Sequence, residues 1–174
     1  IATRSTVGKY KVDVMKDRIL DINPKAEVNV YKCFYLPETK DEFDFSQYDY
    51  VVDAVDTVTA KLEILQRARA AGVPAISCMG TGNKLRPELL RLSTLEKTEG
   101  CPLARVMRKE LRTRGIHHLK VVFSPEKPVS PAQPEAPPPG RRSVPASNPW
   151  VPATAGLLLG SAVVRDLIAQ VSLP

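Results

Sequence analysis

The chain has 174 residues, of which 43% are hydrophobic and 25% are charged, and these proportions fit one globular domain with a sizeable core. Its three cysteines form no C-x-x-C pair, which excludes a zinc ribbon and fits a reducing cytoplasm. The net charge is +6, and residues 84–120 alone hold ten Lys or Arg against four Asp or Glu. Such a basic segment indicates either an anionic partner, such as RNA, a nucleotide or an acidic protein, or a solvated helix face.

The first 47 residues predict one helix, one strand and a loop. We expect a helix over residues 8–23, because Asn23-Pro24 ends an apolar stripe at helical spacing, made of Val12, Met15, Ile19 and Ile22. Residues 26–31 alternate polar and apolar side chains, which predicts a strand. A polar loop then extends to about residue 47.

Residues 48–78 predict a strand, a helix and a second strand, and therefore a parallel pair. The first strand ends at Asp53, and the helix begins near Thr57 and stops at Gly72. Its polar positions are assigned to Lys61, Glu63, Arg67 and Arg69. Asp53 and Asp56 would then lie at the carboxyl end of a strand, where open α/β sheets bind ligands, although Asp56 could equally cap the helix.

The following residues predict a loop, a strand, a basic helix and another strand. Gly80 and Gly82 favour a loop, a strand is expected over residues 88–93, and a further strand over residues 119–123. Between them, residues 102–114 predict an amphipathic helix whose basic residues include Arg105, Arg108, Lys109 and Arg112. Cys101, at the start of this helix, is either a packed thiol or a nucleophile that forms a thioester.

The C-terminal part predicts a proline-rich loop and a last helix. Residues 125–152 hold ten of the 16 prolines, which excludes a helix or a central strand there. Residues 153–171 predict a helix whose apolar run reaches about 15 residues before Arg165, short of the roughly 20 that a membrane span needs. No clear membrane span is therefore predicted, and we expect the sequence GLLLG at 156–160 to let this helix pack closely on the sheet.

The adenylating domain of the ubiquitin-activating-enzyme-like superfamily is similar to three stretches of the chain: TVGKYKVDVMKDRILDINP, VVDAVDTVTAKLEIL and GVPAISCMGTGNKLRP. The family pattern is G-x-x-K, an Asn-Pro helix end and D-x-x-D before a helix, which here are Gly8 with Lys11, Asn23-Pro24, and Asp53 with Asp56. The branch that acts on transfer RNA, the threonylcarbamoyladenosine dehydratases, resembles the chain at LSTLEKTEGCPLARVMRKELRTRGI, VVFSPEKPV and VPATAGLLLGSAVVRDLI.

The resemblance implies an α/β fold: a Rossmann-like adenylating domain, incomplete, with a mostly parallel sheet and an added C-terminal strand and helix segment. We expect residues 1–83 to be the second part of the ATP-binding domain and residues 84–124 a basic strand-helix-strand extension. Residues 125–152 would be the Pro-rich loop and residues 153–174 a C-terminal packing helix. The family's glycine-rich loop, its ribose-binding acidic residue and its Asn-Arg-Gln segment are expected to precede Ile1, so this segment alone should bind ATP poorly.

The activity that the resemblance implies is ATP-dependent dehydration, in which AMP is transferred to a threonyl carboxylate and the activated group then cyclises. Lys11 would contact the phosphates, Asp56 would hold Mg²⁺ and ATP, Thr57 would touch the nucleotide, and Asp53 would shape the strand end. The four basic residues of the helix would meet RNA phosphates. The expected cofactors are ATP and Mg²⁺, the expected partners are tRNA, a second copy of the chain and a sulfur-transfer protein, and the expected location is the cytoplasm.

Two alternatives stay open. An adenylyltransferase could activate the C-terminus of a ubiquitin-like sulfur carrier, although such enzymes commonly carry paired C-x-x-C zinc ligands, which this chain lacks. The other alternative is a non-enzymatic binding module, or an inactive truncated fragment.

Overall fold

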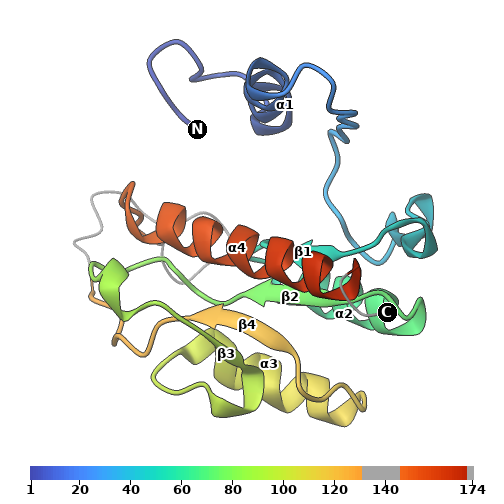
Figure 1. Cartoon of the computed structure of the whole chain (residues 1–174). Helices are drawn as coiled ribbons and strands as arrows, with labels where there is room; N and C mark the ends of the chain where they lie inside the picture. Colours follow the sequence, from blue (N-terminus) through green and yellow to red (C-terminus); the bar gives the residue numbers. More distant parts are fainter. Residues whose placement is uncertain (131–145, 172–174) are drawn as a thin grey trace. The chain divides into compact units, whose positions relative to one another are not determined.

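The computed structural model describes residues 1–130 and 146–171, and it divides the chain into two compact units (Figure 1). The first unit is Ile1–Tyr35 and the second begins at Leu36. Each unit is described by itself below. Part of the predicted proline-rich loop, residues 131–145, lies outside the described residues.

The first unit contains a single helix, α1, at Lys11–Ile22. The backbone N–H of Asn23 closes the last turn on the carbonyl of Ile19 at 2.8 Å, so the helix ends where Asn23-Pro24 predicted. The strand expected over residues 26–31 is wrong, because these described residues form no ladder. Side-chain alternation does not make a strand without a second strand to pair with, and within this unit none is present.

The second unit is built on a four-stranded sheet in the order β1-β2-β4-β3. The strands are β1 at Val51–Asp53, β2 at Ala75–Cys78, β3 at Arg91–Thr94 and β4 at Lys120–Phe123. β1 pairs parallel with β2 and β2 parallel with β4, whereas β3 is antiparallel to β4. The expected α/β class with a mostly parallel sheet is thus confirmed. The strand predicted over residues 88–93 begins later, because Pro87–Leu89 forms a 3-10 turn, η3.

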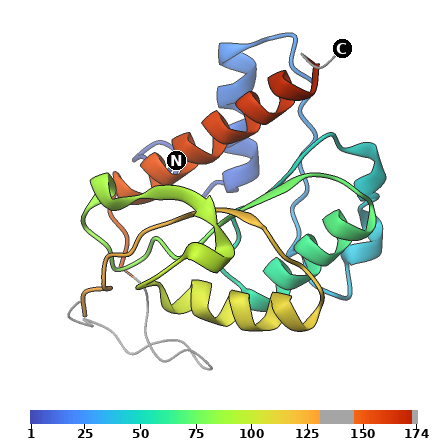
Figure 2. The same cartoon turned by 60° about the horizontal axis from the view of Figure 1, so that its bottom comes forward.

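Helices cover both faces of this sheet (Figure 2). On one face, α2 at Val58–Ala70 and α3 at Pro102–Thr113 pack together in a core cluster that includes Leu65, Met107, Leu111 and Phe123. On the other face, α4 at Val151–Val171 packs against Ile76 and Val122 through Ala155, Leu159 and Ala162. The apolar run of the central strands is therefore buried on both sides, as the parallel pairing requires.

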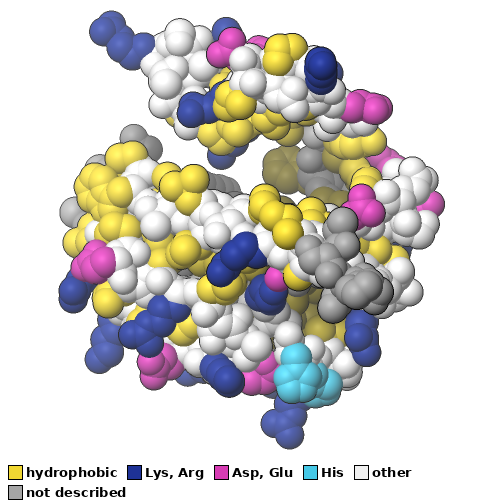
Figure 3. Space-filling view, in the orientation of Figure 1, with side chains coloured by type: hydrophobic (Ala, Val, Ile, Leu, Met, Phe, Trp, Pro, Cys, Tyr) yellow, Lys and Arg dark blue, Asp and Glu magenta, His cyan; other side chains and the backbone are white. Residues whose placement is uncertain are grey.

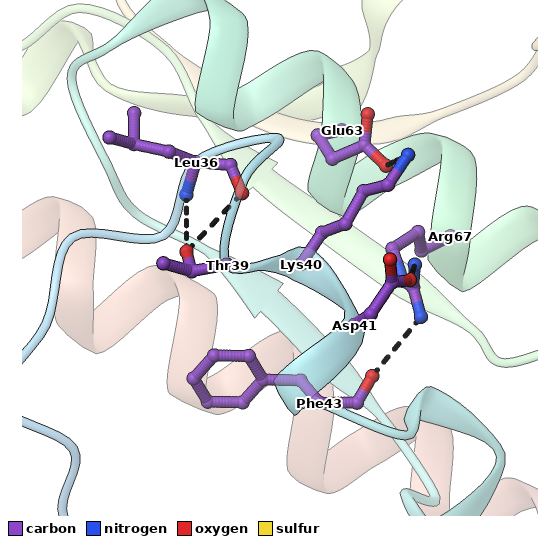
Figure 4. Close-up of polar contacts among 7 residues, drawn as sticks. All are labelled: Leu36, Thr39, Lys40, Asp41, Phe43, Glu63 and Arg67. Carbon is purple, nitrogen blue, oxygen red and sulfur yellow. Dashed lines mark hydrogen bonds and ion pairs between the residues drawn. The ribbon is translucent and has the colours of Figure 1, made fainter.

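The segment before β1 is fastened to α2 by side-chain contacts (Figure 4). It contains two 3-10 turns, η1 at Lys40–Glu42 and η2 at Phe45–Gln47. Lys40 Nζ lies 3.5 Å from Glu63 Oε1, and Arg67 Nη1 lies 2.7 Å from Asp41 Oδ1. The Arg67 guanidinium also donates to the carbonyl of Phe43 at 3.4 Å. The polar face that the sequence assigned to this helix at Glu63 and Arg67 therefore holds the incoming chain.

The last helix packs on the sheet as expected but not through its glycines. A Cβ added to Gly156 or Gly160 would meet no atom within 4 Å, so both glycines face away from the packed side. The close approach comes from Ala155 and Ala162, two helical turns apart, and the expectation that the glycines of GLLLG allow it is wrong. Val151–Gln170 is long and apolar enough to cross a bilayer by length and composition alone, with 22% of it buried. Figure 3 shows hydrophobic side chains on the face that this helix presents.

Candidate active site

A cavity of about 410 Å³ lies at the carboxyl ends of β1 and β2. Its walls are the residues after β1, the loop after β2, the start of α3 and Pro128; the lining residues include Ala54, Val55, Asp56, Cys78, Gly80, Gly82, Asn83, Lys84, Cys101 and Leu103. Both strands are parallel, so their following loops meet at one edge, which is where open α/β sheets bind ligands.

Asp56 lines this cavity with an exposed carboxylate. It does not cap α2: the N-cap is Thr57, whose side chain makes no capping hydrogen bond either. The capping alternative for Asp56 is therefore wrong, and its carboxylate oxygens have no hydrogen-bond role in the described local fold. Thr57 is exposed beside it and does not line the cavity.

A magnesium ion in this cavity would be coordinated by Asp56 and by the phosphates of a bound substrate. The described residues contain no group of three His, Cys, Asp or Glu side chains that could hold a metal. Mg²⁺ keeps several waters and binds through one or two carboxylates together with substrate phosphates, so a single exposed carboxylate fits that mode. The donor set does not fit an all-protein metal site.

Asp53 and Lys61 form a fully buried ion pair behind the cavity. Lys61 Nζ lies 2.9 Å from Asp53 Oδ2, and neither side chain is exposed to solvent. The same ammonium donates to the carbonyls of Val55 at 3.1 Å and Cys78 at 2.7 Å. Ser77, the register partner of Asp53 on β2, donates its hydroxyl to Asp53 Oδ2 at 2.5 Å. Asp53 does shape the strand end, as expected, and Lys61 fixes the loop after β1 and the last residue of β2.

Lys61 is the residue that the sequence analysis assigned wrongly. It was placed on the polar face of the helix, but it lies on the buried face with Ala60, Ile64, Leu65 and Ala68. The signal was present in the spacing: a lysine three, four and seven residues before apolar positions shares their side of a helix. An aspartate at the preceding strand end supplies the reason for a buried lysine, because a buried charge requires a partner.

Lys84 is a second buried lysine, and it lines the cavity itself. Its side chain is 3% exposed. Its ammonium donates to the carbonyls of Ser124 at 2.6 Å and Glu126 at 3.1 Å, so it ties the loop after β2 to the chain leaving β4. Burial lowers the pKa of this lysine from its ordinary value. No feature of the sequence distinguishes it from other lysines near glycines.

Two cysteines also line the cavity. Burial raises the pKa of the Cys78 thiol to about 11, so it is a neutral thiol at pH 7. Cys101 is the N-cap of α3 and is 5% exposed, within the core cluster that contains Met79 and Ala104. This packing favours the first of the two expectations for Cys101, a packed thiol, while its place on the cavity wall leaves the nucleophile a prediction.

The four basic residues singled out on α3 share one groove. Arg105, Arg108, Lys109 and Arg112 line a second cavity of about 550 Å³, together with Glu96, Ile116 and His117. Arg108 is held in place, since its Nη1 donates to the carbonyl and to the hydroxyl of Thr98. The hydrophobic stripe of α3 faces the core, which turns the basic residues outward.

A third cavity of about 300 Å³ lies along α3 and shares lining residues with both sites. It shares Cys101 and Pro102 with the cavity at the strand ends, and Arg105 and Arg108 with the basic groove. Residues of α3 therefore line the candidate active site, the third cavity and the basic groove. Lys11 is the first residue of α1, is exposed and belongs to the first unit.

A family model described as the ThiF family matches residues 1–110. The chain belongs to the ThiF family, and the resemblance expected from the sequence is confirmed. It is 39% identical to the tRNA threonylcarbamoyladenosine dehydratase of Bacillus subtilis over 181 residues, which covers 99% of this chain and 71% of that protein. It is 32% identical to the Escherichia coli protein of the same name, over 75% of this chain and 52% of that one. The chain thus spans about half of the latter.

A solved structure gives the same result for the fold. The Escherichia coli tRNA N6-threonylcarbamoyladenosine dehydratase in complex with ATP matches with a TM-score of 0.82 at 28% identity. The match covers 98% of this chain and 69% of that chain. The Rossmann-like fold expected from the sequence is therefore confirmed.

Proposed function

We propose that the chain is part of an ATP-dependent dehydratase that acts on threonylcarbamoyladenosine in tRNA. The observation that carries this proposal is the cavity at the carboxyl ends of the parallel strands with the exposed Asp56 carboxylate on its wall, in a chain 39% identical to a dehydratase of that name. Binding of ATP by a structure of the same fold supports the nucleotide.

The proposed chemistry activates a carboxylate. Hydroxide is a poor leaving group, so the threonyl carboxylate first attacks the α-phosphate of ATP, which forms an acyl adenylate and releases pyrophosphate. A nitrogen or oxygen of the same modified side chain then attacks the acyl carbon and expels AMP. One carboxylate oxygen leaves in AMP and one proton leaves from the ring-closing group, so the nucleoside loses one water.

The proposed roles follow from charge. Asp56 would share Mg²⁺ with the phosphates of ATP, since hard carboxylate oxygens suit that ion. Mg²⁺, when bound, neutralises charge on the phosphates. Lys11 would contact the phosphates as a flexible point charge, and Thr57 would touch the nucleotide. These three residue assignments, like the Mg²⁺ ion, rest on the family pattern and on the exposure of each residue.

The basic groove of α3 is proposed as the surface for tRNA. Arg105, Lys109 and Arg112 are exposed, and they form no ion pair with any residue in the described part of the chain. Three cationic side chains without ion-pair partners lie within two helical turns, and such a cluster favours binding of phosphate groups. The third cavity, which shares residues with both sites, supports a path along α3 by which RNA on the groove delivers its modified nucleoside to the active site.

The proposed assembly and location follow from the family resemblance: a homodimer, a sulfur-transfer partner protein and a cytoplasmic enzyme. The adenylyltransferase alternative is kept for a specific reason: a probable molybdopterin-synthase adenylyltransferase is 40% identical to this chain over 55 residues. Against it, the chain lacks paired zinc cysteines.

One experiment separates these functions. The full natural chain is incubated with ATP, Mg²⁺ and tRNA that carries threonylcarbamoyladenosine, and the nucleoside is examined by mass spectrometry. Loss of one water, abolished in Asp56→Ala and retained in Asp49→Ala, is the expected result. If the nucleoside is unchanged while a Gly-Gly-tailed carrier protein stimulates exchange of pyrophosphate into ATP, the adenylyltransferase replaces the dehydratase.

A further inference from the structure

The two buried lysines of this unit differ in their partners. Lys61 uses its three N–H donors on Asp53 and on two carbonyls, so its charge is balanced by a carboxylate. Lys84 donates to two carbonyls only. An ammonium has three N–H donors, so one donor of Lys84 has no acceptor among the described residues. Lys84 lies on the wall of the cavity.

No carboxylate among the described residues lies within ion-pair distance of Lys84. The nearest candidate is Glu126, and its carboxylate already accepts the backbone N–H groups of Leu85 at 3.0 Å and Arg86 at 3.1 Å. Carbonyl dipoles satisfy hydrogen bonds but do not neutralise a charge. A buried cation without a counter-ion is costly, and such a cost is retained where a ligand supplies the missing charge.

The position of Lys84 is fixed from both sides. Its own carbonyl accepts the side-chain amide of Asn148 at 2.6 Å, and the carbonyl of Leu85 accepts the indole N–H of Trp150 at 2.8 Å. Asn83 has a left-handed backbone with φ of 59° and is anchored by Val129 and Ala146. These contacts fix the backbone around Lys84, and the carbonyls of Ser124 and Glu126 fix its ammonium, so a ligand would meet it with little ordering cost.

We propose that Lys84 is an anion-binding residue of the active-site cavity, and that the counter-ion of its buried ammonium is a phosphate or carboxylate group of the ligand bound there. The inference rests on the proposed function only for the identity of that ligand. A cation on the wall of the same cavity as Asp56 would hold one anionic group directly, while Asp56 would act through Mg²⁺. Two sources share this chemistry: the phosphates of ATP and the threonyl carboxylate of the nucleoside.

The test measures binding by isothermal titration calorimetry in the full natural chain. Mg²⁺-ATP, inorganic pyrophosphate and free threonylcarbamoyladenosine are titrated into the wild type, Lys84→Met and Lys84→Arg. Lys97→Met, which removes an exposed lysine elsewhere in the unit, is the matched control. We expect Lys84→Met to weaken the binding of at least one of these ligands by about 10- to 100-fold, because a charge-assisted hydrogen bond is lost. Lys84→Arg should recover part of that loss.

The ligand that weakens identifies the anion. Loss of ATP and pyrophosphate binding assigns Lys84 to the phosphates, and loss of nucleoside binding alone assigns it to the carboxylate. Unchanged binding of all three ligands overturns the proposal. If Lys84→Met does not fold, the side-chain resonance of Lys84 in the ¹³C-lysine-labelled wild type is followed during the same titrations, and the absence of any shift overturns it equally.

The outcome is separable from the proposed function. If pyrophosphate binding depends on Lys84 while the nucleoside never loses water, the anion site is supported and the proposed dehydratase activity is refuted. If water is lost at the wild-type rate in Lys84→Met, with unchanged binding, the dehydratase stands and this inference falls.

Discussion

Lys61 and Asp53 form an ion pair that is completely excluded from solvent, with 2.9 Å between Nζ and Oδ2. The pair joins α2 to the end of β1, and the two carbonyls on Lys61 extend it to the loop after β1 and the last residue of β2. Because both line the cavity, the geometry of the candidate active site depends on a contact that no ligand touches. Lys61 is a positioning residue in this sense.

Removing Lys61 alone should destabilise the fold strongly. Lys61→Met leaves Asp53 buried without a cation, and breaking a buried pair in this way costs about 3–5 kcal/mol. The free energy of unfolding in urea measures it. Lys40→Met is the control: Lys40 is a half-exposed lysine whose ion pair at 3.5 Å should contribute under about 1 kcal/mol.

A double variant tests whether the charge is the cause. Asp53→Asn together with Lys61→Met removes both charges, so its loss of stability should be smaller than the sum of the two single losses by about 2 kcal/mol. Additive losses would mean that the two side chains act through packing and not as a pair.

The sequence predicts the part of this fold that periodicity controls. The strand, helix and strand over residues 50–78 follow from apolar spacing, and Asp56 falls at the expected edge because parallel strands end together. The direction of Lys61 was missed, since a charged residue is assigned to solvent until its buried partner is known. Residues 26–31 were missed because a strand needs a neighbour that local alternation cannot supply. The burial of Lys84 was missed because its ammonium is held by carbonyls 40 and 42 residues away in the sequence.

Gly100 should tolerate no side chain. Its φ is +67°, and a Cβ there would lie 2.2 Å from the carbonyl oxygen of Pro125. Gly115 has the same φ of +67° with no atom within 4 Å of its Cβ position, which isolates the two effects. Gly115→Ala should cost about 1–2 kcal/mol from the left-handed backbone alone, and Gly100→Ala clearly more. Thermal unfolding of the two variants provides the comparison, and equal losses would contradict the clash.

Neutralising the basic groove should weaken tRNA binding in a salt-dependent way. If Lys109 and Arg112 each meet one phosphate, Lys109→Gln and Arg112→Gln should each lower the slope of log K against log salt by about 0.7–0.9. Arg165→Gln is the control, because Arg165 is exposed on α4, which covers the opposite face of the sheet. Filter binding over a salt series gives the slopes. Equal slopes for the α3 variants and the wild type would place the RNA elsewhere.

The attachment of α4 should weaken in acid. Asp166 receives the Tyr50 hydroxyl at 2.7 Å and the Lys120 ammonium at 2.6 Å, and its hydrogen bond from Lys120, followed by that from Tyr50, holds the pKa of Asp166 below 3.8. A depressed carboxyl pKa contributes stability that is present above the unfolded value near 3.8 and is lost as pH falls through the folded value. The cluster is part-exposed, so after solvent screening it contributes about 1 kcal/mol to the free energy of unfolding.

Asp166→Asn should therefore lower the free energy of unfolding by about 1 kcal/mol at pH 7 and by progressively less below pH 4, where the wild type loses the same charge. Urea unfolding at pH 7, 5, 4 and 3 follows the difference between the two proteins. The matched control is Asp49→Asn, an exposed carboxylate one residue before Tyr50, which should change stability at none of these pH values. A difference for Asp166→Asn that stays constant down to pH 3 would show that the amide perturbs packing and that the carboxylate charge does not fasten the helix.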